Sequence, residues 1–135
     1  MWVVDTCLVL DVLENDPRFG VSSAELLDSR LAQGLVLCPV SFVELAPAFA
    51  GNLDRQRFFL DQVGIRCDED WQLSDTEQAH TAWHHHVGRR RARFVPKRPV
   101  ADVLIGAFAL RFDGLLTRNP DDFRRLLPSL KLVEP

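Results

Sequence analysis

MWVVDT, residues 1–6, is the stretch that decides the fold predicted for this chain. Residues 2–4 are aromatic or β-branched, which suits a strand buried on both faces. The carboxylate of Asp5 follows this strand directly. Open α/β sheets bind their ligands beyond the carboxyl ends of parallel strands. If residues 2–4 form a central strand, Asp5 therefore lies where such a sheet holds a ligand.

Short apolar segments alternate with helical patterns along the rest of the chain. The segments that we predict as further strands are 35–38, 65–67, 115–117 and 130–133. Between them, apolar residues recur at helical spacing, and serine–glutamate pairs three residues apart predict capping boxes at three helices. These pairs are Ser22 and Glu25, Ser41 and Glu44, and Ser74 and Glu77. The alternation predicts a three-layer α/β/α fold with a mainly parallel central sheet, in one domain over residues 1–135.

The composition is that of an ordinary globular protein. A length of 135 residues suits one domain, and the formal charge of −3 neither favours nor excludes nucleic acid. The cysteines Cys7, Cys38 and Cys67 lack a paired spacing, so we expect reduced thiols in a cytoplasmic protein. No apolar run reaches the roughly 18 residues that a membrane span needs, and no signal-peptide pattern is present.

Four acidic residues stand close to predicted strand ends and helix starts. They are Asp5 after the first strand, Glu44 and Asp102 in first helical turns after prolines, and Asp122 after the strand at 115–117. The helix dipole stabilises an exposed first-turn acid by about 0.3–1 kcal/mol, which explains any one of them alone. Four carboxylates at one end of a sheet repel one another. A divalent cation would remove the conflict, and carboxylate oxygens suit Mg²⁺ or Mn²⁺.

The ordered set of motifs resembles the PIN-domain ribonucleases, in particular the VapC-type toxins of bacterial toxin–antitoxin pairs. Besides Asp5, the motifs are PVSFVEL at 39–45, PVADVLIGAFAL at 99–110 and LLTRNPDDF at 115–123. Together they cover almost the whole chain in the family's order. The resemblance implies a PIN fold and Mg²⁺- or Mn²⁺-dependent cleavage of RNA. It also implies a cognate antitoxin as partner and a homodimer.

Carried over position by position, Asp5, Glu44 and Asp102 match the three central metal-binding acids of that family. Asp122, just before a phenylalanine, fits the fourth acid of the toxins, whereas many other PIN domains carry an acid where this chain has Asn119. The resemblance therefore implies a catalytic, metal- or water-binding role for Asp122 and a supporting polar role for Asn119.

Two threonines adjoin these positions. Thr6 follows Asp5, and Thr117 ends the strand before Asn119. Their hydroxyl groups would bond water or phosphate at the site, or they would satisfy backbone groups nearby.

A basic run precedes Asp102, and we expect it to contact RNA. Its members are Arg89, Arg90, Arg91, Arg93, Lys97 and Arg98. Positive charge beside an acidic metal site attracts a phosphate backbone, and antitoxin binding would compete for the same surface. The histidines just before it are expected to lie on a solvated helix face rather than in a zinc site. These are His80, His84, His85 and His86.

Two other function classes stay open. An aspartyl-phosphate phosphatase also begins from a strand that ends in aspartate, but it requires a second aspartate two residues later, where this chain has Cys7. The second class is a non-catalytic RNA- or protein-binding module of the same fold, against which the intact set of four acids argues. If the protein acts on RNA, its RNA target depends on the shape of the groove and of the RNA.

Overall fold

A five-stranded parallel sheet forms the centre of the protein. The computed structural model describes the backbone of residues 1–92 and 100–135, and the side chains of residues 1–88 and 100–135. The strand order is β3-β2-β1-β4-β5, so the first strand of the chain is the central one. The strands are β1 (Trp2–Val4), β2 (Leu35–Leu37), β3 (Ile65–Arg66), β4 (Leu115–Leu116) and β5 (Leu132–Val133).

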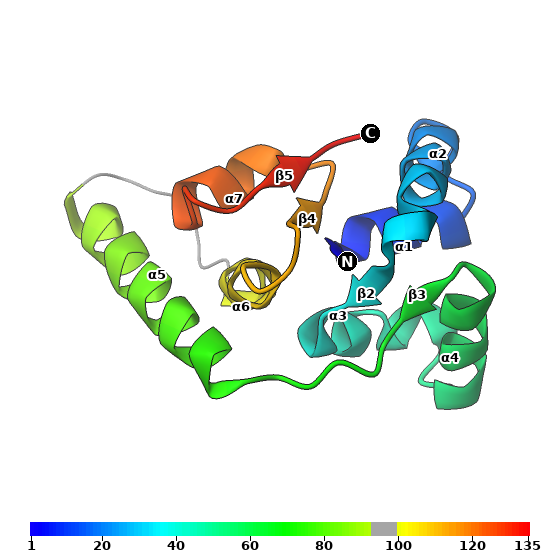
Figure 1. The fold of residues 1–135 in the computed structure, drawn as a ribbon, viewed down its shortest axis with the longest axis horizontal. Coiled ribbons are helices and arrows are strands. Elements are labelled where there is room, and N and C mark those ends of the chain that lie inside the picture. The colour runs from blue at the N-terminus through cyan, green and yellow to red at the C-terminus, as the bar shows by residue number, and fades with distance from the viewer. Residues whose placement is uncertain (93–99) are drawn as a thin grey trace.

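Seven α-helices and two short 3₁₀ helices connect these strands in the described part of the chain. The α-helices are α1 (Thr6–Leu13), α2 (Gly20–Arg30), α3 (Pro39–Glu44), α4 (Leu53–Gln62), α5 (Leu73–Ala92), α6 (Val100–Ala109) and α7 (Pro120–Leu126). The 3₁₀ helices are η1 (Leu31–Gln33) and η2 (Ala46–Phe49). Figure 1 shows α5, α6 and α7 on one side of the sheet and α1, α2 and α4 on the other.

Two apolar cores pack against opposite faces of the sheet, because successive strand residues point to opposite faces. Val3 of β1 belongs to the core that contains Phe108 and Phe123 of α6 and α7. Its neighbour Val4 belongs to the core that contains Leu8 of α1 and Leu60 of α4. The predicted three-layer α/β/α fold is therefore confirmed, and every strand pairing is parallel.

The predicted capping boxes are wrong, because each helix starts before its serine. α2 begins at Gly20, so Ser22 lies inside it and donates a hydrogen bond to the carbonyl of Phe19 at 3.2 Å. α3 begins at Pro39, which suits the first helical position and places the buried Ser41 inside the helix. α5 begins at Leu73, and Asp75 rather than a serine accepts a backbone N–H near its start.

No helix in the described part of the chain combines the length and the apolar character that a membrane crossing demands.

Candidate active site

Asp5 lies at the carboxyl end of the central strand and is 6% exposed. Its Oδ2 accepts a hydrogen bond from Thr117 Oγ1 at 2.7 Å and one from Cys7 Sγ at 3.2 Å. Burial raises the pKa of Asp5, while these two hydrogen bonds act in the opposite direction. The carboxylate is thus held by two donors from different elements in a poorly solvated position.

Glu44 is brought to the same end of the sheet. It is the exposed last residue of the six-residue α3, rather than a first-turn residue as predicted, because α3 begins at Pro39. The hydroxyl of Thr6 donates to Glu44 Oε1 at 2.7 Å, although the two residues are 38 positions apart. Since Thr6 directly follows Asp5, this bond ties the end of α3 to the end of β1.

Three other acids lie close enough to Asp102 to act on its carboxyl group. Asp102 lies in the first turn of α6, as predicted. Burial raises the pKa of Asp102 to about 6, and the charges of three further carboxylates act in the same direction: Asp5, Asp122 and Glu44. The fold therefore gathers acids from four separate segments into one region where their charges conflict.

Asp122 and Asn119 occupy the start of α7. Asp122 lies in the first turn, is exposed, and accepts a hydrogen bond from Arg125 at 3.1 Å. Asn119 precedes the helix, but its side chain does not cap it. Instead, the Asn119 backbone N–H donates to Thr117 Oγ1 at 3.0 Å.

In this conformation the acids do not form a ready metal cage. Among residues 1–88 and 100–135, no three His, Cys, Asp or Glu side chains are grouped so that they could hold one ion. The carboxylates instead face neighbouring donors, as Asp5 does with Thr117 and Glu44 with Thr6. Their oxygen donors suit Mg²⁺ or Mn²⁺, and Glu44 and Asp122 are exposed to solvent.

The basic run cannot be placed against this site. Arg93, Lys97 and Arg98 lie outside the described residues, and the residues at 89–91 are described only by their backbone in α5. The RNA-contact prediction for this run stays a prediction.

The predicted solvated face of histidines is wrong at one position. His86 is only 4% exposed, and its ring lies 5.8 Å from that of Trp83. His84 and His85 are exposed, with ring centroids 6.0 Å apart. The histidines in the described part of the chain form no metal-holding group.

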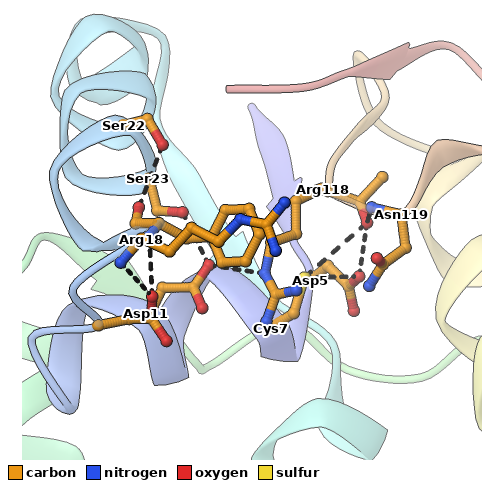
Figure 2. Close-up of polar contacts among 11 residues, drawn as sticks. Asp5, Cys7, Asp11, Arg18, Ser22, Ser23, Arg118 and Asn119 are labelled. Atoms are coloured by element: carbon orange, nitrogen blue, oxygen red, sulfur yellow. Dashed lines mark hydrogen bonds and ion pairs between the residues drawn. The ribbon is translucent and has the colours of Figure 1, made fainter.

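Sequence reasoning missed a polar network beside Asp5 (Figure 2). Asp11 is 2% exposed, and its Oδ2 accepts from Ser23 Oγ at 2.8 Å and from Arg118 Nε at 2.9 Å. Cys7, which donates to Asp5, was also missed as a site residue. One signal was present, because Asp11 interrupts the apolar run LVLDVL and a buried charge requires a partner. No local pattern identified that partner.

Comparison with known proteins assigns the fold. The parallel sheet with helices on both its faces is an α/β fold, and the following match to a solved structure makes that fold PIN-like. A VapBC2 chain from Rickettsia felis, in a crystal structure with a DNA fragment from the promoter, matches with a TM-score of 0.75. The match covers 98% of this chain and 97% of that chain at 16% sequence identity. No family model and no curated protein matches the sequence. The PIN fold that the motifs imply is thereby confirmed.

Proposed function

We propose that this protein is a Mg²⁺- or Mn²⁺-dependent endoribonuclease. The observation that carries the proposal is the pKa of Asp102, which is raised to about 6, first by burial and then by the charges of Asp5, Asp122 and Glu44. A fold that gathers buried and exposed carboxylates without a compensating cation loses stability. Such an arrangement is typical of sites where function, rather than stability, requires the charges.

Asp5, Glu44, Asp102 and Asp122 would hold one or two divalent ions. When bound, such an ion would polarise a phosphoryl oxygen and lower the pKa of water, which is the chemistry that phosphodiester hydrolysis needs. The resemblance of the motifs to PIN-domain ribonucleases supports RNA as the substrate. The raised pKa of Asp102 also means that cation binding would release a proton at a pH of about 6 and below.

Several neutral side chains orient these acids. Thr117 and Cys7 both donate to Oδ2 of Asp5. Thr6 donates to Oε1 of Glu44 in the same way. Hydrogen bonds of this kind fix the orientation of ligating carboxylates and are part of a working metal site.

The biological setting that we propose is the toxin half of a type II toxin–antitoxin pair. The matching Rickettsia felis structure is of VapBC2 bound to promoter DNA, which supports a cognate antitoxin as the partner of this chain. We also propose a single domain over residues 1–135, because both cores pack on one sheet. We further propose that the protein forms a homodimer and is located in the cytoplasm.

The deciding experiment is RNA cleavage by purified protein with Mn²⁺, with EDTA, and with the variants Asp5→Asn and Asp102→Asn. We expect cleavage with Mn²⁺, leaving 5′-phosphate and 3′-hydroxyl ends, and none with EDTA or either variant. The control is Asp54→Asn, which removes an exposed first-turn acid of α4, a helix that carries none of the four acids. Full activity in a folded Asp5→Asn, Asp102→Asn double variant would overturn the proposal. Mn²⁺ binding without cleavage would favour the non-catalytic module.

A further inference from the structure

We propose that the Asp11–Arg118 ion pair is a clamp that positions the segment 117–119 around Asp5, so that Asp11 and Arg118 are positioning residues of the site. The inference rests on the proposed function for its catalytic consequence. Its structural part concerns only how three residues of the chain are held. The clamp joins the first strand and first helix to a segment more than a hundred residues later.

The segment is short and is anchored at its middle. β4 ends at Leu116 and α7 begins at Pro120, so only 117–119 lie between them. Thr117 Oγ1 donates to Asp5, and it also accepts the Asn119 N–H. The Arg118 side chain extends instead to Asp11 on α1 (Figure 2).

Asp11 is a firm anchor because it is almost fully buried. Its side chain is 3% exposed, and Ser23 of α2, itself fully buried, donates to the same Oδ2 that Arg118 contacts. A carboxylate in such a position is strongly destabilised without its cationic partner. The folded protein therefore holds Arg118 in one place, and with it the backbone of 117–119.

A second contact fixes the guanidinium from its flat face. The Arg118 guanidinium lies 4.4 Å from the centroid of the Phe19 ring, a cation–π contact. The backbone that carries this ring is held in turn, because Asp16 Oδ1 accepts the Phe19 N–H at 2.8 Å. Asp11 and Phe19 together restrain the Arg118 side chain, which is 30% exposed.

The chain contains a matched control for this clamp. Arg111 Nε donates to the buried Asp75 at 2.7 Å, so the molecule holds a second aspartate–arginine pair of the same kind. In the described part of the chain, the side-chain hydrogen bonds of Arg111 and Asp75 go to one another, to the Asp70 carbonyl and to the Gln72 N–H. None of these bonds reaches the four acids or the side chains that hold them. Loss of the second pair should therefore lower stability without removing a hydrogen bond from the acids.

The test compares Asp11→Asn and Arg118→Lys with Asp75→Asn and Arg111→Lys. Three quantities are measured on each folded protein: hydrogen exchange of the Asn119 amide by NMR, Mn²⁺ affinity by calorimetry, and kcat and KM for RNA cleavage. We expect the two clamp variants to exchange the Asn119 amide faster and to lose about 10–100-fold in Mn²⁺ affinity or kcat, as when partners of metal ligands are removed. The control pair should keep wild-type values of all three.

Two results would overturn the clamp. One is Asn119 exchange and Mn²⁺ affinity at wild-type levels in both clamp variants. The other is a loss in Arg118→Lys with none in Asp11→Asn, since Arg118 would then act on the site without its anchor. If Asp11→Asn does not fold, Ser23→Ala weakens the same anchor and replaces it, with the same expected losses. If the wild-type protein cleaves no RNA while the exchange result holds, the nuclease proposal fails and the clamp stands.

Discussion

Neutralising Asp102 should stabilise the protein in the absence of metal. The pKa of Asp102 rises from 3.8 to about 6 on folding, first because of burial and then because of the neighbouring acids. At 1.36 kcal/mol per pH unit, a difference of this size corresponds to about 3 kcal/mol for a fully shielded group. Asp102 is partly exposed, and screening by solvent reduces the figure to about 1–2 kcal/mol.

The pH dependence of this gain has a definite sign. Because the pKa is raised in the folded state, the favourable contribution of Asp102 is complete below about 3.8 and is lost as the pH rises through about 6. Asp102→Asn lacks this titration. Its advantage over wild type should therefore be full at pH 8 and absent near pH 3.5.

The assay is urea unfolding of both proteins in EDTA at pH 8 and at pH 3.5. Asp54→Asn is the control, because Asp54 is also a first-turn acid but on α4, where the helix dipole favours the charge and its loss should cost stability. Adding Mn²⁺ at pH 8 should raise the free energy of unfolding of the wild type more than that of Asp102→Asn, because a ligand that binds the folded state stabilises it. An Asp102→Asn variant no more stable than wild type at pH 8 in EDTA would refute the reasoning.

Three further results are expected. Asp122→Asn should abolish RNA cleavage. Asp121→Asn should keep wild-type cleavage, although Asp121 is one residue earlier on the same helix and is likewise paired with an arginine. Equal activities of the two variants would remove Asp122 from the site. Burial raises the pKa of the Cys7 thiol to about 12. Iodoacetamide at pH 8 should therefore label exposed Cys67 well before Cys7, as followed by mass spectrometry. The reverse order of labelling would contradict the burial of Cys7. Gly106→Ala should lower the free energy of unfolding by about 1–3 kcal/mol through overpacking, because its Cβ would overlap the side chain of Leu127 and lie tight against that of Phe123. Unchanged urea unfolding would count against that packing.

The sheet and the helix order were predictable because they follow from repeated patterns. Short apolar strands such as 2–4 and 35–37 each precede a helix, and that alternation favours a parallel sheet. Helix starts were less predictable. A serine–glutamate spacing is only a local signal, and Pro39 overrode it at α3 by taking the first helical position.

The candidate acids were found from their positions relative to strands, but their partners were not. That Asp102 lies close enough to the other acids to raise its pKa is a property of the folded chain. The bond from Thr117 to Asp5 joins residues 112 positions apart, and Asp11 and Arg118 are separated by 107. No local pattern encodes such pairings, because they arise only when the sheet brings distant segments together.

The central place of β1 in the sheet has a consequence for synthesis on the ribosome. The first strand gains its second neighbour only after β4 has been synthesised, because Val3 pairs with Leu115 and Val4 with Leu116. Long-range pairing of this kind delays folding until both strands are present. Asp5 likewise receives its hydrogen bond from Thr117 only then. A nascent copy of the proposed nuclease would therefore remain inert toward the message that encodes it until the segment that contains β4 and Thr117 has left the ribosome.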